Sequence, residues 1–431
     1  MDWLPNRCTA REVQDCKVLM RPKSETRMDD MDEGEVRTLV ERGETHDQIS
    51  HHLKQIYPNR RGISARSVRR FCSQRDIRQR NEMNDDELDR VIESRVSAVG
   101  HTYGRRTMHG LLRAEGLSVC QRRVGESLQR TNPFQHSLRR ANVQRSVNPV
   151  PYRADFFGEK LHLDQNEKLV MYGVVHVLAI DGYSRKLVGL VTMPRKNPIT
   201  IYNTLFQPVL QQHGLWDQVR TDHGTEFVLV STIQQFLAPL RGRQHRCPVL
   251  KTTSRHNHRA ERIWPEINSR INYPIKRVLV SMEEQEEIDM NDDLTKFCVS
   301  WVTINVLTPA IQKFVSSWNS HRIPGGNGGV PNVLARVSNE TTPLQSASVP
   351  SVDYAVTLHE NAGGTLSPEG YYGVDPIAGY PQLQELRLRD FKLTYPSMDE
   401  LFEDVLHHHG AGFKQAIHFF VHLTQSYGTL L

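Results

Sequence analysis

Apolar residues recur every three to four positions through the first third of the chain, which is the period of an amphipathic helix. Gly43 ends the first such segment, and Thr45 and Gln48 have the spacing of a capping box at the start of the second. Ser64 can cap a third helix over Ala65 to Cys72. The apolar stripe of the first two expected helices consists of Val36, Leu39, Val40, Ile49, Leu53 and Ile56.

The third expected helix carries Arg66, Arg69 and Arg70 on its exposed face. Three short helices of which the last is basic are typical of a helix-turn-helix, whose recognition helix enters the major groove of DNA. We therefore predict a DNA-binding unit over residues 33–80. An ordinary three-helix bundle with a basic surface would show the same pattern. Residues 1–30 lack periodicity and are expected to form a flexible N-terminus.

A second run of helical periodicity covers residues 84–131. The segment Asp85 to Val99 is amphipathic, a helix opening at His101 runs to Glu115 before Gly116, and a last helix begins at Ser118. The two runs cannot be aligned as a repeat, but they have the same plan. The sequence predicts a second DNA-binding unit here, with the contact residues Arg105, Arg106, Arg122 and Arg123.

The pattern changes after a proline-containing, arginine-dotted linker over residues 132–154. Two β-rich apolar runs, Val174–Ile180 and Leu187–Val191, flank an Asp181-Gly182 pair, which is a strong signal for a tight turn. One further strand and three helical segments follow, namely Val219–Asp222, Ile201–His213, His256–Leu279 and Leu294–Trp318. This order of strands and helices predicts an α/β, RNase H-like core over residues 155–336.

Charge is distributed unevenly along the 431 residues, although the net charge is only +5. Residues 51–150 hold 20 Lys and Arg against 9 Asp and Glu, whereas residues 340–431 hold 4 against 11. A basic front half suits contact with phosphate groups, and a solvated basic surface is the simpler alternative. The acidity of the last region, 337–431, argues against DNA binding there and for contact with a protein partner.

Composition restricts the remaining classes of protein. Six scattered cysteines form neither a C-x-x-C pair nor a zinc spacing, so neither a disulfide framework nor structural zinc is expected. The N-terminus lacks the apolar region of a signal peptide, and no apolar run reaches the length that spans a bilayer. We therefore expect an intracellular protein without a membrane segment.

Three carboxylates have local settings that suggest metal binding. Asp164 ends the extended run Leu161–Leu163, Asp222 follows the run Gln218–Thr221, and Glu261 lies in a helix-compatible stretch. Two strands and a helix can bring such side chains together around a divalent ion. The gaps between the three are 58 and 39 positions, and among 49 acidic residues such gaps arise easily by chance. The local settings, not the spacing, therefore support the prediction.

Each carboxylate also has a simpler explanation. Asp164 could be solvated at a strand end, although a free carboxylate in an apolar run is costly, and Asp222 could merely cap its loop. Glu226 and Glu266 are rivals for the third position, whereas Asp181 is better explained by the turn. The nearby histidines are more often polar neighbours than ligands of metal or DNA, and they are His223, His256 and His258.

Carboxylate oxygens are the ligands that Mg²⁺ and Mn²⁺ prefer. Two such ions about 3.5–4 Å apart can activate a nucleophile and stabilise a leaving 3′ oxygen in phosphodiester transfer. Without metal, three converging carboxylates repel one another, and the pKa of at least one rises. The sequence thus predicts that Asp164, Asp222 and Glu261 hold Mg²⁺ or Mn²⁺, with Asp164 between two ions and no side chain needed as a general base.

The central region closely resembles the retroviral-type integrase core found in transposon-derived eukaryotic proteins. The resemblance rests on a series of motifs over residues 155–336 and not on any one of them. The motifs are Leu161-His162-Leu163-Asp164, Ile180-Asp181-Gly182-Tyr183-Ser184-Arg185, Arg220-Thr221-Asp222-His223-Gly224-Thr225-Glu226-Phe227, His256-Asn257-His258-Arg259-Ala260-Glu261-Arg262, and Trp318-Asn319-Ser320-His321-Arg322 followed by Pro331.

The resemblance implies an RNase H-like fold and metal-dependent cleavage and strand transfer at DNA 3′ ends, with Asp164, Asp222 and Glu261 as the catalytic residues. It implies that Asn257 and Arg262 contact the DNA backbone. It also implies a homo-oligomer that holds element ends and target DNA in the nucleus. The chain departs from the family in lacking a His-His-Cys-Cys zinc module, so recognition of DNA ends falls to the helical units.

Two other functions are compatible with the sequence. A domesticated protein could keep the fold and the DNA-binding units after losing the reaction, although the intact carboxylates weigh against this. An RNase H-like nuclease acting on a structured or hybrid substrate is the third hypothesis, and the paired DNA-binding units argue against it.

Overall fold

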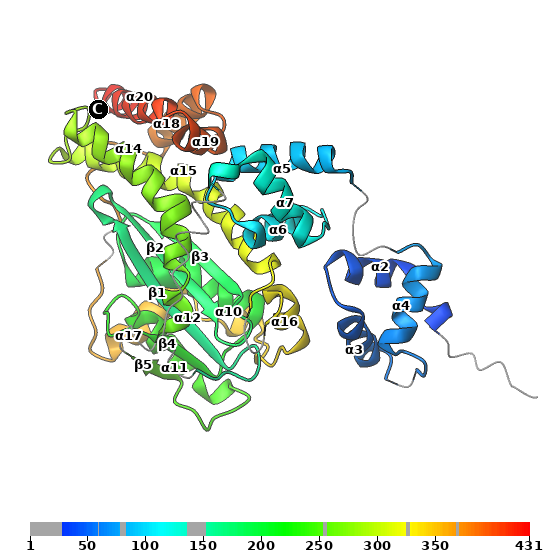
Figure 1. Ribbon diagram of the computed structural model, residues 1–431. Helices are drawn as coiled ribbons and strands as arrows, with labels where there is room; N and C mark the ends of the chain where they lie inside the picture. The colour runs from blue at the N-terminus through cyan, green and yellow to red at the C-terminus, as the bar shows by residue number, and fades with distance from the viewer. Residues whose placement is uncertain are drawn as a thin grey trace, which may run out of the picture. The chain divides into compact units, whose positions relative to one another are not determined.

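The computed structural model describes residues 28–58, 60–77, 83–135, 152–252, 257–324, 328–367 and 370–431 (Figure 1). The chain divides into two compact units, Met1–Gln79 and Arg80–Leu431. Most of the predicted N-terminal segment, and residues 136–151 of the predicted linker, lie outside the described residues. The domain boundaries inferred from the sequence stay predictions.

Three helices form the first unit: α2 (Glu33–Glu41), α3 (His46–Ile56) and α4 (Ala65–Gln74), after a short turn, η1 (Met28–Asp30). Thr45 and Gln48 form the predicted capping box of α3, and Ser64 caps α4 by accepting from the backbone N–H of Ser67. The apolar faces of the three helices make one small core. The predicted helices are confirmed, but Ile56, at the end of α3, is 47% exposed and lies outside the core.

The second unit begins with α5 (Asp85–Val99), α6 (Arg105–Ala114) and α7 (Gln121–Thr131). The predicted bounds of α5 are confirmed. The predicted starts of the other two, at His101 and Ser118, were wrong, because Gly104 and Cys120 are the N-cap residues. Before α6 the chain turns to bury Tyr103, whose ring centroid lies 5.3 Å from the guanidinium of Arg270.

α6 packs directly on α15 (Asp293–Ser320), the long central helix of the second unit. Ser317 donates its hydroxyl to the carbonyl oxygen of Thr107 at 2.7 Å. Gly110 faces the backbone of α15 at Ser317 and the side chain of His321, so a Cβ atom at this position would collide with both. Glycine inside a helix costs about 1 kcal/mol relative to alanine. Here that cost is offset by the close contact of the two helices.

A five-stranded sheet lies in the middle of the second unit, in the order β3-β2-β1-β4-β5. β1, β2 and β3 are antiparallel neighbours, whereas β4 and β5 run parallel to β1. The strands are β1 (Lys160–Leu169), β2 (Val174–Asp181), β3 (Leu187–Met193), β4 (Gln218–Thr221) and β5 (Val249–Lys251). This mixed sheet with its helices confirms the predicted α/β, RNase H-like fold. β5 was not predicted, because three residues are too few to show a period.

Side chains alternate across β2, so each face of the sheet has its own core. Leu178 and Ile180 belong to one core, and Val177 and Ala179 to the other. The helices of the first face are α12 (His258–Glu261), α13 (Trp264–Ile267), α14 (Tyr273–Glu284) and α15, with a π-helical turn, Asn268–Asn272, before α14. The second face is covered by α9 (Pro198–Ile201), a π-helical turn (Tyr202–Phe206), α10 (Gln207–His213), α11 (Val228–Phe236) and α17 (Val352–Asn361).

The β2–β3 connection differs from the predicted tight turn. It spans residues 182–186, and Arg185 rather than Gly182 takes the left-handed conformation, with a φ of 61°. Glycine is required at position 182 because a Cβ there would collide with the hydroxyl of Tyr152. The buried carboxylate of Asp181 accepts hydrogen bonds from the loop backbone and from Trp216 Nε1. Asp181 therefore stabilises the loop.

The chain after residue 330 is helical in the structure. Its helices are α16 (Pro331–Val337), α17, α18 (Pro381–Thr394), α19 (Met398–His407) and α20 (Ala411–Gly428). α18, α19 and α20, orange to red in Figure 1, gather beside α14 and α15. Phe420 of α20 stacks on Trp301 of α15 with ring centroids 4.2 Å apart, and Phe391 of α18 meets the same indole edge-on. The acidic region thus contributes apolar side chains to the core around α15.

A buried ion pair supports this C-terminal layer. Arg387 donates to both carboxylate oxygens of Asp375 at 2.7 Å, and the two side chains are 3% and 2% exposed. The guanidinium also lies 5.2 Å and 5.1 Å from the ring centroids of Phe297 and Phe420. Neither charge has access to water that could replace its partner.

α15 is long and apolar enough, by length and composition alone, to cross a membrane. This finding contradicts the prediction that no apolar segment is long enough to span a bilayer. In the folded unit 61% of its most apolar window is buried. β3, α6, α19 and α20 cover it, so it is the central helix of a core.

A buried histidine links the sheet to the π-helical turn before α14. His176 is fully buried, and its two ring nitrogens each lie 2.8 Å from a partner, Nδ1 from Thr192 Oγ1 and Nε2 from Asn272 Oδ1. Asn272 donates its Nδ2 to Asn268, so its Oδ1 accepts and Nε2 of the histidine carries the proton. Burial lowers the pKa of His176 to about 4.

We predict that Arg387→Ala lowers the free energy of unfolding by about 3–5 kcal/mol, because the Asp375 carboxylate is left buried without its partner. Urea denaturation of the full chain measures the change. The matched control is Arg389→Ala on the same helix, whose side chain is 63% exposed. Its expected effect is below about 1 kcal/mol. Equal losses in the two variants would contradict a special contribution of the buried pair.

We predict that stability falls as the pH is lowered from 6.5 towards 4, because the unfolded chain then binds a proton that folded His176 does not. The full effect of this shift is about 3 kcal/mol. His176→Gln should flatten the curve of unfolding free energy against pH in that window, whatever its stability at neutral pH. Exposed His422 supplies the control variant, His422→Gln. An equally steep curve for both variants would rule out the assignment.

Candidate active site

The pairing of β1 with β4 sets two of the predicted carboxylates side by side. The strands are parallel, with Lys160 opposite Gln218, an offset of 58 positions. Asp164 and Asp222 are separated by the same 58 positions. The register therefore places Asp222, just after the last residue of β4, beside Asp164 of β1. The gap of 58 positions between the two aspartates, which alone is not significant in the sequence, is therefore the same as the offset between the paired strands.

Asp164 is buried, with 6% of its surface exposed. Its carboxylate accepts hydrogen bonds from Trp264 Nε1 at 2.9 Å and from the backbone N–H of Gln165 at 3.0 Å. Burial raises the pKa of Asp164 to about 7; the bond from Trp264 opposes this rise, and the negative charges of Glu261 and Asp222 add to it. The three predicted carboxylates thus share one electrostatic neighbourhood.

Glu261 is the last residue of α12, a single helical turn that starts after Asn257. The backbone N–H of Glu261 donates to the carbonyl oxygen of Asn257 at 3.1 Å. The Asn257 side chain, 1% exposed, donates from Nδ2 to the carbonyl oxygen of Leu163 at 2.9 Å. Leu163 immediately precedes Asp164. One amide therefore ties the turn that carries Glu261 to the strand that carries Asp164.

The other end of the Asn257 amide continues into a chain of hydrogen bonds. Because Nδ2 is the donor to the strand, Oδ1 accepts from His162 Nδ1 at 2.6 Å. Burial lowers the pKa of His162 to about 3, so the ring is neutral and its Nε2 accepts from the hydroxyl of Tyr152 at 2.8 Å. The sequence did not lead us to predict these hydrogen bonds. A histidine between two leucines in a buried strand was the one local sign that such partners exist.

The two rivals for the third carboxylate position differ in their surroundings. Glu226 is 5% exposed, and its Oε1 is buried without a hydrogen-bond partner among the described residues. Glu266 forms an ion pair with Arg270 and is therefore engaged within the protein. In the loop that precedes Glu226, the carboxylate of half-buried Asp222 accepts from the backbone N–H of Gly224 at 3.1 Å. Glu226 thus remains a rival of Glu261, and Glu266 is the weaker one.

The donor set suits a hard divalent cation, because it consists of carboxylate oxygens. Within the described residues, no three His, Cys, Asp or Glu side chains stand close enough to enclose an ion. Burial is the main cause of the raised pKa of Asp164, and the negative charges of Glu261 and Asp222 add to it. A cation would offset these negative charges, so the donors suit a metal by their chemistry and not by a preformed cage of ligands among the described residues. His256 lies outside the described residues.

The predicted DNA-contact arginines fall into separate groups. In the first unit the three on α4 are all exposed, namely Arg66, Arg69 and Arg70. In the second unit four line one cleft, namely Arg105, Arg106, Arg122 and Arg262. Arg123 instead donates to the carboxylate of Asp85 at 2.6 Å. Asn257 is buried with both ends of its amide occupied. Arg123 and Asn257 thus have partners within the protein, and their contact with DNA stays a prediction.

Residues 152–340 match the family model of the integrase core domain. This part of the chain is an integrase core of the retroviral type. The match includes all five strands, α12 and the three carboxylates, and it confirms the resemblance inferred from the motifs. No match to a curated protein was found. The integrase core supports a polynucleotidyl transferase type of function in general, while the assignment of its catalytic residues stays a prediction.

We predict that Asn257→Ala loosens α12, because it leaves the Leu163 carbonyl and the His162 ring N–H buried without partners. The expected loss of stability is about 3 kcal/mol, against about 1 kcal/mol for Tyr152→Phe, which removes only the hydroxyl at the far end of the chain. Hydrogen exchange of the peptide that contains Glu261 should accelerate more in Asn257→Ala than in Tyr152→Phe. Unchanged exchange there, with stability lost, would mean that Asn257 does not hold this helix.

Proposed function

We propose that this protein is a DDE-type DNA integrase or transposase, which cleaves DNA at 3′ ends and joins those ends to target DNA. The observation that carries the proposal is the β1–β4 register, which sets Asp222 beside Asp164 inside an integrase core, with Glu261 on a turn that Asn257 ties to the same strand. Keeping the buried carboxylate of Asp164 beside two further carboxylates costs free energy. A site that binds a divalent cation and phosphate oxygens recovers this cost on binding.

The protein's own contribution to this chemistry is positioning. The β1–β4 register holds Asp164 and Asp222, Asn257 holds the turn of Glu261, and Trp264 orients the carboxylate of Asp164. Bound Mg²⁺ or Mn²⁺ would supply activation of the attacking oxygen and stabilisation of the leaving 3′ oxygen. These side chains are thereby fixed before DNA arrives, so little reorganisation remains for the reaction.

The helical units support DNA as the substrate. Exposed Arg66, Arg69 and Arg70 on α4 suit a recognition helix, and the arginines of the second unit add a second basic surface. We extend the proposal to a nuclear protein that acts as a homo-oligomer on two DNA ends, and to a protein partner for the acidic surface of residues 337–431. A catalytically silent DNA-binding protein derived from a transposon is the alternative, and the complete carboxylate set favours the active enzyme.

We predict that Asp164→Asn reduces metal-dependent strand transfer of a labelled DNA end by more than about a hundredfold. This loss exceeds the 10–100-fold that is typical when a residue hydrogen-bonded to a metal ligand is replaced, because here the ligand itself is replaced. The asparagine keeps the shape of the side chain and an acceptor for Trp264. Asp155→Asn, an exposed aspartate of the same core, is the matched control and should retain activity. Duplexes from the DNA that flanks the gene provide candidate ends.

Binding of Mn²⁺, followed by electron paramagnetic resonance, tests the site without any knowledge of the DNA ends. Wild type and Asp155→Asn should bind the ion, and Asp164→Asn should bind it more weakly. Full strand transfer by Asp164→Asn would overturn the mechanism. Binding of DNA by wild type without turnover in either metal would favour the silent alternative.

A further inference from the structure

The cleft that collects four of the predicted arginines contains more positive charge than the sequence indicated. It has a volume of about 1,210 Å³ and lies between α6 and α7 on one side and α12 and α13 on the other, within the second unit. It is lined by three further arginines, Arg185, Arg259 and Arg270. Among its described lining residues, seven arginines face only two carboxylates, those of Glu126 and Glu266. Its volume exceeds the range of about 300–1,000 Å³ that is usual for small ligands.

The arginines on the α12 side crowd one another. Burial and, to a lesser extent, the charges of Arg259 and Arg262 lower the pKa of Arg185 to about 10. Nε atoms of Arg259 and of Arg270 are buried without a hydrogen-bond partner among the described residues, and Arg270 is only 7% exposed. Like charges held together in this way are stabilised by an anion from outside the protein.

α6 begins at this cleft, whereas α7 lines it with one face that runs from Arg122 to Gln129. α6 starts after Gly104 and α7 starts after Cys120, and neither first turn is capped by a side chain. The first backbone N–H groups of a helix have no partner within the helix, and they form a ready site for phosphate. The exposed side chains of Arg105, Arg106 and Arg122 lie in these first turns and add full positive charges.

We propose that this cleft holds the sugar–phosphate backbone of the DNA that enters the integrase core. Arg259 and Arg262 stand on either side of Glu261 in the sequence of α12 and its end, so a strand bound there runs past the helix of the third carboxylate. Contact at Gly110 fixes α6 to α15, and the helical unit and the core therefore form the two walls of one site. The inference rests on the proposed function and names the surface that binds the substrate.

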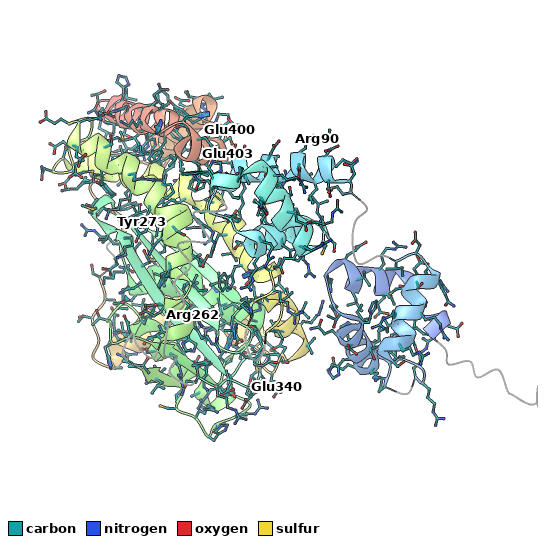
Figure 2. The ribbon with its side chains drawn as sticks, in the orientation of Figure 1. Arg90, Arg262, Tyr273, Glu340, Glu400 and Glu403 are labelled. Atoms are coloured by element: carbon teal, nitrogen blue, oxygen red, sulfur yellow. The ribbon has the colours of Figure 1, made fainter. Side chains whose placement is uncertain are left out.

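The test measures binding of a short fluorescent DNA duplex to the full-length protein in EDTA, so that cleavage plays no part. Arg105→Gln/Arg106→Gln should weaken binding about tenfold at low salt. It should also reduce the slope of log affinity against log salt by about 2, since each phosphate contact contributes about 0.9. The control is Arg90→Gln/Arg389→Gln, which removes two exposed arginines outside the cleft. Figure 2 shows Arg90 on α5, well away from Arg262, which follows α12.

Arginine modification of the wild-type protein by phenylglyoxal locates the contact without any variant. Bound DNA should protect Arg122 and Arg262 from the reagent and leave Arg90 reactive. Circular dichroism of the variants shows whether they keep their fold, and the protection pattern stands if one of them does not.

The remaining outcomes separate this inference from the proposed function. One outcome would be that Arg69→Gln/Arg70→Gln on α4 loses DNA binding while the cleft variant binds fully. If DNA also fails to protect Arg122 and Arg262, the inference about the cleft is overturned. The integrase proposal would then remain intact. Absence of DNA binding in the wild type would overturn both. Tight binding of polyglutamate in the cleft, with no competition from DNA, would identify an acidic protein segment as the occupant and overturn the inference.

Discussion

The parallel pairing of β1 with β4 sets the positions of the carboxylates at the candidate active site. Its offset of 58 positions brings Asp222 beside Asp164. Asn257 then fastens the turn of Glu261 to the carbonyl oxygen of the residue before Asp164. Because side chains alternate along a strand, a slip of one residue would send Asp222 to the opposite face of the sheet. The cores on both faces prevent that slip, so the packing of apolar residues also sets the position of the carboxylates.

α12 separates two clusters of opposite charge. Glu261, at its end, contributes to a group of carboxylates that raise the pKa of Asp164, while Arg259 and Arg262 contribute to a group of cations that lower the pKa of Arg185. A divalent cation complements the first and a phosphodiester backbone the second, and these two charges occur together in a nucleic acid that is bound through metal. The two unfavourable clusters therefore suit the same substrate.

Features set by local sequence could be predicted, and features set by distant partners could not. The helices of the first unit follow from their caps and period, and the carboxylates from their settings at strand ends. The hydrogen bonds of Tyr152 with His162 and of His162 with Asn257 span 10 and 95 positions. A histidine in a buried strand indicates that partners are needed, but no local pattern identifies them. Arg123 looked like a free cation because Asp85, its partner, lies 38 positions earlier. Gly182 suggested a tight turn after β2. In the structure glycine is needed there because a Cβ atom would collide with the hydroxyl of Tyr152.

α15 is shared by parts of the chain that are far apart in sequence: α6 lies on it from one side, β3 is beneath it, and α19 and α20 complete its cover. Its composition is that of a membrane span, yet its apolar surface is enclosed. The acidic C-terminal helices cover part of the apolar surface of α15 and present charged side chains to the solvent in its place. A chain shortened to the integrase core would expose the surface of this helix that α6, α19 and α20 cover, and a large exposed apolar surface favours aggregation or attachment to membranes.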